Sequence, residues 1–166
     1  MLRLGNETLA ERAVTMMGEG GCDPVVIVVG AQPLAIDGAR VVVNPDWETG
    51  MGSSLRSGLE ALSRVDVEAV VVTLVDMPGV SAEAVRRVAA KASPGALVSA
   101  GYDGRRGHPV LFGREHWAGI ASMAIGDVGA RAYLSKREVE VVDCADVASD
   151  DDIDTAEDAR RWLDRW

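Results

Sequence analysis

The sequence predicts an α/β fold around a mostly parallel sheet, and two observations carry that prediction. Apolar runs without polar alternation, at residues 24–31, 39–45 and 69–75, are typical of strands that are covered on both faces. Segments with a helical spacing of apolar residues lie between these runs, so strand and helix alternate along the chain. Because 166 residues suffice for one domain with a sizeable core, we expect residues 1–166 to form a single α/β domain.

The individual elements follow from local signals. Thr8 and Glu11 form a capping box that starts the first helix, and the glycines at 18–21 end it. Thr155 and Asp158 predict the start of the last helix in the same way. The predicted strands occupy residues 24–31, 39–45, 69–75, 96–100, 108–112 and 139–142, with a turn over 101–107. The predicted helices occupy residues 9–17, 53–62, 81–91, 114–121, 128–134 and 155–166.

Composition narrows the class of protein. A formal net charge of −9 argues against a nucleic-acid groove or an anionic membrane surface as the partner, because both require clustered Lys and Arg. This negative charge does not exclude a nucleotide as the ligand, since a metal ion and backbone amides can hold phosphates. Cys22 and Cys144 have no metal-binding spacing, and no apolar stretch is long enough to cross a bilayer. We therefore expect reduced cysteines and a cytoplasmic protein without a signal peptide.

Asp76 directly follows the apolar run at 69–75, where Pro78 stops the strand. Ligands of open α/β sheets collect at the carboxyl ends of the strands, and a carboxylate there can hold Mg²⁺ and through it a triphosphate. The structural alternative is an aspartate that caps a turn or the next helix. From the residue alone, the two interpretations have about equal weight.

A glycine pair precedes the helix predicted from Ser53. Gly50 and Gly52 flank Met51, and the first turn then offers free backbone N–H groups with the hydroxyls of Ser53 and Ser54. Such a terminus suits an anion or the polar edge of a base. An ordinary helix start with a serine cap is the alternative, and it has the larger weight without further context.

His108 is placed between Gly107 and Pro109, which restrict its backbone and can direct the imidazole into a cleft at a strand start. A hydrogen-bonded turn histidine is the commoner alternative, and no nucleophile stands beside it. Near the end of the chain, Asp152 and Asp154 point to the same side if the segment is extended. A cation would relieve their repulsion and, with Asp76, bind phosphate oxygens; the alternative is an acidic approach to a helix.

Five motifs then occur in order: NPDWETGMGSSLRSGL at 44–59, LVDMP at 74–78, GHPVLF at 107–112, GDVGAR at 126–131 and DIDTAED at 152–158. In this order and spacing they resemble the MobA-like nucleotidyltransferases, and most closely their molybdenum cofactor cytidylyltransferase branch. The resemblance covers essentially the whole chain. It implies a three-layer Rossmann-like nucleotidyltransferase fold with a mostly parallel mixed sheet.

The resemblance also implies an activity and a set of residues. The activity is Mg²⁺-dependent transfer of CMP from CTP to molybdopterin with release of pyrophosphate, and a molybdoenzyme is a candidate partner. Asp76 is then catalytic as a Mg²⁺ ligand, with Asp152 or Asp154 as the second acidic ligand. The residues expected along the nucleobase are Gly50, Met51, Ser53 and Ser54. Those expected on the acceptor side are Gly107, His108 and Pro109.

One departure concerns the N-terminal side. The family begins with a buried strand and a loop of the form Leu-Ala-Ala-Gly-x-x-x-Arg-Met-Gly-x-x-Lys that holds the triphosphate, and this chain matches the family just after that loop. We expect the absent first strand to leave unpaired edges and a gap beside the strands at 24–31 and 69–75. Intact downstream motifs favour a natural chain that is longer by this strand and loop. The alternative is a non-catalytic paralogue that binds a pterin or a partner in molybdoenzyme maturation.

Overall fold

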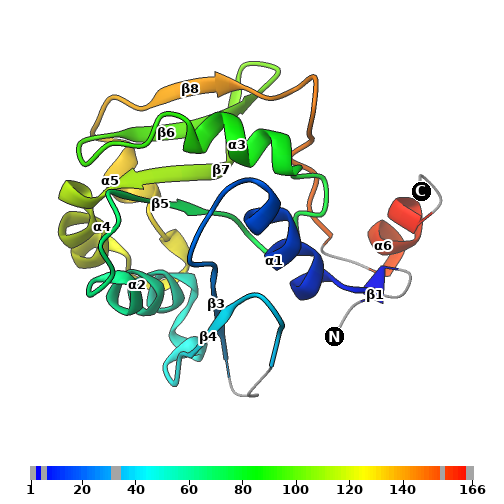
Figure 1. Cartoon of the computed structure of the whole chain (residues 1–166), viewed down its shortest axis with the longest axis horizontal. Coiled ribbons are helices and arrows are strands. Elements are labelled where there is room, and N and C mark those ends of the chain that lie inside the picture. Colours follow the sequence, from blue (N-terminus) through cyan, green and yellow to red (C-terminus); the bar gives the residue numbers. More distant parts are fainter. Residues whose placement is uncertain (1–2, 5–6, 31–34, 154–155, 164–166) are drawn as a thin grey trace.

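The strands form a four-stranded sheet, a separate parallel pair and a short hairpin (Figure 1). The structure is a computed structural model that describes residues 3–4, 7–30, 35–153 and 156–163. The strands are β1 (Arg3–Leu4), β2 (Glu7–Thr8), β3 (Val26–Val29), β4 (Arg40–Val43), β5 (Ala69–Val72), β6 (Leu97–Tyr102), β7 (Arg105–Gly113) and β8 (Glu140–Asp143). The helices are α1 (Leu9–Glu19), α2 (Met51–Leu62), α3 (Ala82–Ala89), α4 (Trp117–Met123), α5 (Arg131–Leu134) and α6 (Ala156–Leu163). Short 3₁₀ turns are η1 (Trp47–Thr49), η2 (Arg114–His116) and η3 (Gly126–Val128).

The larger sheet has the order β5-β7-β6-β8. β7 runs antiparallel to both β5 and β6, and β8 runs parallel to β6. Three of these strands therefore share one direction and β7 opposes them. The predicted α/β class with a mostly parallel mixed sheet is confirmed.

The parallel pair of β3 and β4 is separated from this sheet. A cavity of about 490 Å³ lies between β3 and β5, and both strands contribute to its lining.

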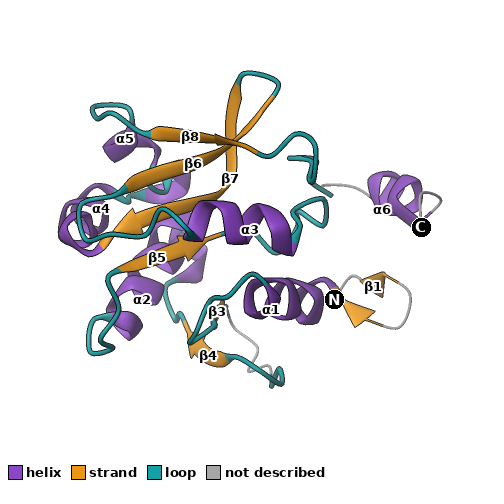
Figure 2. Ribbon diagram, turned by 45° about the horizontal axis from the view of Figure 1, so that its top comes forward, coloured by secondary structure: helices purple, strands orange, loops and turns teal. Residues whose placement is uncertain are grey.

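Helices cover both faces of the strands, which gives the three predicted layers. α1 and α3 lie on one face, and α2, α4 and α5 lie on the other (Figures 1 and 2). The core under α2, α4 and α5 is built mainly from large side chains: Leu59, Leu62, Leu97, Val110, Phe112, Trp117, Ile120 and Tyr133. No helix in the described ranges combines the length and the apolar character that a membrane span needs.

Two predicted boundaries are wrong at the hairpin of β6 and β7. The turn is confined to Asp103 and Gly104, whose φ angles are +50° and +81°. Both residues adopt the left-handed conformation that a two-residue hairpin turn requires, and Asp-Gly is a preferred pair for it. The strands therefore extend into the predicted turn, and His108 lies inside β7 rather than at the start of a strand.

Helix starts were predicted with mixed success. The capping box of Thr8 and Glu11 is present at α1, with Thr8 Oγ1 accepting from the Glu11 amide at 3.1 Å. In contrast, α2 begins at Met51 with Gly50 at the cap position, so the alternative of a serine cap at Ser53 is wrong. The predicted cap residue Thr155 lies outside the described residues.

Candidate functional site

Asp76 lies in the segment that leaves the carboxyl end of β5. The Asp76 Oδ1 and Thr73 Oγ1 atoms are buried, and neither has a hydrogen-bond partner within the described part of the chain. An unpaired buried polar atom is costly, and a carboxylate oxygen more so than a hydroxyl. A cation, or a ligand that donates hydrogen bonds, would satisfy the carboxylate oxygen.

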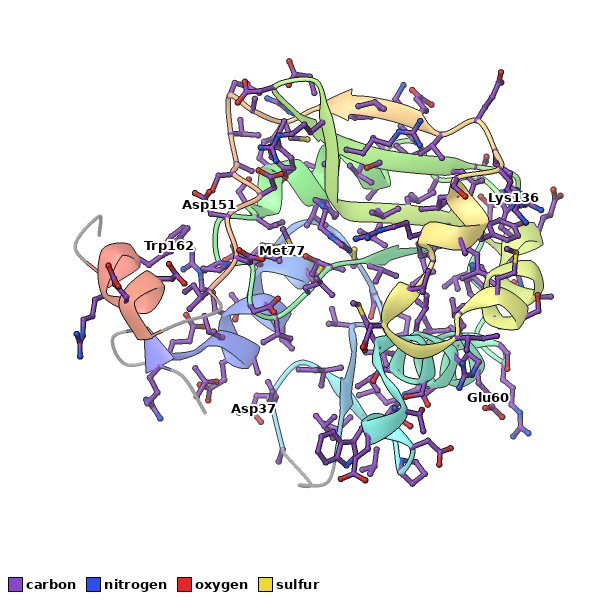
Figure 3. All side chains as sticks on the ribbon, turned by 180° about the vertical axis from the view of Figure 1, so that it is seen from behind. Asp37, Glu60, Met77, Lys136, Asp151 and Trp162 are labelled. Atoms are coloured by element: carbon purple, nitrogen blue, oxygen red, sulfur yellow. The ribbon has the colours of Figure 1, made fainter. Side chains whose placement is uncertain are left out.

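The acidic segment from the end of the chain runs beside this turn. The Ile153 amide donates to the Asp76 carbonyl at 2.8 Å, and the Ser149 amide donates to the Gly79 carbonyl at 3.0 Å. Figure 3 labels Met77 and Asp151, one on each of these neighbouring segments. Asp152 is exposed, and Asp154 lies outside the described residues. The structure thus brings the acidic segment to Asp76.

His108 reaches the same region from β7. Its carbonyl accepts a hydrogen bond from the Tyr102 hydroxyl at 2.6 Å, and its side chain lines the cavity between β3 and β5. Burial lowers the pKa of His108, and the nearby negative charge of Asp76 opposes that shift. The imidazole is therefore neutral at pH 7 and has one nitrogen to donate and one to accept.

The neighbours of His108 are held by packing. A Cβ added at Gly107 would lie 2.9 Å from the Tyr102 ring and 3.3 Å from the Asp150 Cβ atom. The Ser99 hydroxyl donates to the Gly107 carbonyl at 2.9 Å, and Pro109 is fully buried. Both residues place His108, and neither lines the cavity.

The glycines at the start of α2 allow a loop to approach closely. A Cβ at Gly50 would lie 2.5 Å from the Gly126 carbonyl carbon, and one at Gly52 would lie 2.6 Å from the Ala124 oxygen. The Met51 amide donates to Asp127 Oδ1 at 3.3 Å. In this structure a carboxylate of the chain itself therefore lies at the helix N-terminus, where it is favoured by the helix dipole.

Asn44 organises the serines of α2 and is a residue that we did not single out from the sequence. It is 1% exposed, and its Nδ2 donates to Ser53 Oγ at 2.7 Å and to Ser54 Oγ at 3.1 Å. Ser53 Oγ in turn lies within donating distance of the carbonyls of Asp46 and Gly50, at 3.0 and 2.8 Å. The signal in the sequence is a single polar residue directly after the apolar run of β4.

The cavity connects the two halves of the predicted site. Met51 and Ser54 of α2 line it on one side, and Thr73 and His108 line it near the end of β5. The predicted nucleobase and acceptor segments therefore open onto a common space. Ser53 is buried and is not among the lining residues.

A divalent metal fits this site in part. Asp76 Oδ1 is a buried carboxylate oxygen without a partner in the described ranges, which is the donor type that Mg²⁺ prefers. The described residues include no group of three or more His, Cys, Asp or Glu side chains arranged to hold a metal. Further oxygen ligands would have to come from phosphate, water or the acidic segment.

Comparison with known proteins assigns the family. A model of the MobA-like NTP transferase domain matches residues 1–141. Nicotine blue oxidoreductase from Paenarthrobacter nicotinovorans is 37% identical over 98% of this chain and 86% of that protein. A probable molybdenum cofactor guanylyltransferase from Opitutus terrae is 34% identical over 49% of this chain and 41% of that protein.

Solved structures share the fold of this chain. The manganese complex of Rv0371C from Mycobacterium tuberculosis H37Rv is 25% identical, with a TM-score of 0.79 over 100% of this chain and 91% of that one. A homologue of that protein from Mycobacterium sp. strain JC1 is 26% identical, with a TM-score of 0.77 over 99% of this chain and 86% of that one. With the family match covering most of the chain and the fold preserved throughout, this chain belongs to the MobA-like NTP transferase family.

Proposed function

We propose that this protein transfers CMP from CTP to the terminal phosphate of molybdopterin and releases pyrophosphate. The observation that carries the proposal is the buried Asp76 Oδ1 atom, which has no hydrogen-bond partner among the described residues and lies beside an acidic segment at the carboxyl end of β5. Family membership supports nucleotidyl transfer. The name of the Opitutus terrae relative, a guanylyltransferase, supports a molybdenum cofactor as the acceptor and GTP as the donor. The resemblance of the ordered motifs to the cytidylyltransferase branch supports CTP instead.

The reaction needs no nucleophilic side chain. An oxygen of the acceptor phosphate attacks the α-phosphorus of CTP and forms the new P–O bond. The bond from that phosphorus to the bridging oxygen of the β-phosphate breaks, and pyrophosphate leaves with the electron pair. Because a phosphate is ionised near neutral pH, no base has to remove a proton from it. The protein acts by positioning the two phosphates and by balancing their charge.

The predicted residues divide into three roles. We assign Asp76 as the Mg²⁺ ligand, with Asp152 or Asp154 as its acidic partner, and the ion would balance the charge of the phosphates when bound. Along the nucleobase we place Gly50, Met51, Ser53 and Ser54, with Met51 and Ser54 open to the cavity and Ser53 holding Asn44. On the acceptor side, Gly107 and Pro109 fix the backbone of a neutral His108.

Calorimetry tests this proposal directly. We expect CTP to bind only with Mg²⁺ or Mn²⁺, and Asp76→Ala to weaken the binding at least tenfold. Asp66→Ala is the matched control, because Asp66 is exposed and lies before β5. The same titration with GTP in place of CTP decides which nucleobase the protein prefers. The measurements use the chain of 166 residues and a version that carries the family's glycine-rich loop ahead of Met1. If the extended version bound a pterin independently of metal and of Asp76, and bound no nucleotide, the protein would be a non-catalytic paralogue.

A second candidate function rests on the relative with 37% identity, whose name describes an oxidoreductase. An oxidoreductase of this fold would need a redox partner such as a reduced nicotinamide dinucleotide, whose phosphates can bind at the same strand ends. The same titration with NADH and NADPH separates the two candidates. Binding of a dinucleotide without binding of CTP or GTP would favour the oxidoreductase.

A further inference from the structure

The side chain of Asn44 is held in one orientation by its neighbours. The Asp46 amide lies 3.0 Å from Asn44 Oδ1, and because a backbone N–H can only donate, the oxygen of the Asn44 side chain must face it. The nitrogen, Nδ2, therefore faces α2, where its two hydrogens match the hydroxyls of Ser53 and Ser54 at 2.7 and 3.1 Å. The reversed orientation would bring two donors together at a residue that is 1% exposed, which is costly.

This orientation decides where the proton of each serine hydroxyl can go. A hydroxyl has one proton, and because both serines accept from Asn44, that proton points to another acceptor. The Gly50 carbonyl lies 2.8 Å from Ser53 Oγ and can take its proton. In the described part of the chain, no acceptor takes the proton of Ser54 Oγ. Ser54 lines the cavity between β3 and β5, so its hydroxyl is a hydrogen-bond donor on the cavity wall.

The cavity wall around this donor is uncharged. Met51, Leu55 and Ala130 line the cavity together with Ser54, and no Lys or Arg is among the described lining residues. A phosphate oxygen beside Ser54 would therefore find no cation on the described wall to balance its charge. An uncharged group with a carbonyl oxygen or an unprotonated ring nitrogen fits this donor and its apolar neighbours.

We propose that Asn44 is a positioning residue that fixes the Ser54 hydroxyl as a donor, and that this donor selects ligands with an uncharged acceptor atom at this wall. The chemical class is a flat ring that carries a carbonyl oxygen or a bare ring nitrogen, such as the edge of a nucleobase. Only the identification of this ring with the base of a nucleotide rests on the proposed function.

A probe without phosphate tests the donor independently of the proposed function. N-methylpyridone is a flat, uncharged ring whose polar group is a carbonyl acceptor. In NMR titrations of the whole chain, we expect it to shift the amide signals of Ser54 and Leu55. Ser54→Ala should weaken its binding by about fivefold or more, whereas Ser54→Thr, which keeps a hydroxyl, should bind it as the wild type does.

Ser57→Ala is the matched control for these titrations. Ser57 also lies in α2, but its hydroxyl donates to the Ser53 carbonyl at 3.0 Å and it is not among the cavity-lining residues. We expect it to bind the probe with unchanged affinity. Absence of shifts at Ser54 up to the solubility limit of the probe, or equal affinity of the wild type and Ser54→Ala, would overturn the proposal.

Reversing the polarity of Asn44 tests its positioning role. In Asn44→Asp the carboxylate would accept from both serines, so the proton of Ser54 would turn away from the cavity. We expect N-methylpyridone to bind about threefold more weakly or worse, and aniline, whose amino group donates, to bind more tightly. In the Ser54→Ala background, Asn44→Asp should change neither affinity, because Asn44 acts through Ser54. Weaker binding of both probes in both backgrounds would indicate a structural role and overturn the proposal.

The side-chain amide of Asn44 gives a second measurement that does not depend on the folding of Asn44→Asp. Both Nδ2 hydrogens of the wild type should be protected from exchange with solvent, and Ser54→Ala should speed the exchange of one of them at least tenfold. Rapid exchange of both hydrogens in the wild type would contradict the assigned orientation and overturn the proposal.

Nucleotide titrations decide what the acceptor belongs to. CTP and inorganic triphosphate, each with Mg²⁺, are compared in the wild type and in Ser54→Ala. We expect the substitution to weaken CTP binding by about fivefold or more and to leave triphosphate binding unchanged. An equal loss for triphosphate would overturn the uncharged acceptor. If the wild type bound N-methylpyridone but neither phosphate compound, the proposed function would fail and the donor role of Ser54 would stand.

Discussion

The amide of Ile153 donates a hydrogen bond to the backbone carbonyl of Asp76 at 2.8 Å. This bond joins the acidic segment near the end of the chain to the turn after β5. The turn holds a carboxylate oxygen that is buried and has no partner among the described residues. Negative charge from two distant parts of the sequence is thereby concentrated at the carboxyl end of one strand, where α/β sheets bind their ligands.

Replacing Asp76 separates a binding role from a structural one. We expect Asp76→Asn to leave the midpoint of thermal unfolding unchanged or higher in the absence of metal, because the substitution removes a buried carboxylate without breaking a side-chain hydrogen bond of Oδ1. Metal-dependent CTP binding should fall at least tenfold in the same protein. Unfolding is followed by circular dichroism and binding by calorimetry.

The control for this substitution is Asp66→Asn, at an exposed position, which should change neither quantity. A drop in the unfolding midpoint of more than about 4 °C for Asp76→Asn would mean that the carboxylate stabilises the fold, and the turn interpretation of Asp76 would then be correct.

Elements that depend on local signals could be predicted from the sequence. The capping box of Thr8 and Glu11 is formed within one turn of helix, so its residue pattern suffices to locate the start of α1. The apolar runs at β3 and β5 likewise predicted strands, because covering both faces excludes polar alternation. The length of the β6–β7 hairpin was missed, since the long polar stretch hides a two-residue Asp-Gly turn.

Features that depend on distant contacts could not be predicted. Gly52 is needed because the chain at Ala124 crosses the helix start, and nothing near Gly52 in the sequence shows that approach. The neighbouring residues predict that Ser53 caps the helix. Its hydroxyl instead accepts a hydrogen bond from Asn44, which is buried beside it. Ile153, whose amide donates to the backbone carbonyl of Asp76, is also far away in sequence. Candidate residues could be named, but not which hydroxyls and carboxylates remain open to a ligand.

Gly52→Ala should be strongly destabilising. The added Cβ would lie 2.6 Å from the backbone carbon and oxygen of Ala124, which cannot move aside as a flexible side chain could. We expect a loss of about 2 kcal/mol or more in the free energy of unfolding, measured by urea denaturation.

Gly18→Ala is the matched glycine control inside a helix. Among the described residues, no atom outside the backbone of α1 and the adjacent residues lies within 4 Å of the added Cβ there. The better helix propensity of alanine should therefore raise the stability by up to about 1 kcal/mol. Equal effects of the two substitutions would contradict the close approach of the chain at Ala124 to α2.

Ser53→Ala tests whether this serine acts through Asn44. The substitution removes the acceptor of the 2.7 Å hydrogen bond from Asn44 Nδ2 and leaves a buried donor with Ser54 as its side-chain partner. We expect a loss of about 1–3 kcal/mol in the free energy of unfolding. Ser63→Ala removes an exposed hydroxyl that bonds only within its own turn, so it should change stability by no more than about 0.5 kcal/mol. A stable Ser53→Ala protein that had lost CTP binding would instead assign Ser53 to the nucleotide.

The pH dependence of Cys22 labelling shows whether the cavity wall at this residue is shielded from water. Both cysteines are free, and Cys22 lines the cavity between β3 and β5, whereas Cys144 is fully buried. Burial raises the pKa of the Cys22 thiol above its ordinary value of 9.0. Because the thiolate is the reactive form, a raised pKa leaves less of it at any pH below that value. The rate of labelling by a disulfide reagent should therefore still rise with pH at pH 9.0, where an ordinary thiol is already half ionised.

In the Cys144→Ala protein, Cys22 is the thiol that the reagent labels. In the Cys22→Ser protein, the remaining thiol of Cys144 is fully buried and should react only as fast as the protein unfolds. A labelling rate with its half-maximum at or below pH 9.0 would contradict the prediction, because the pKa of the thiol would then not be raised by burial.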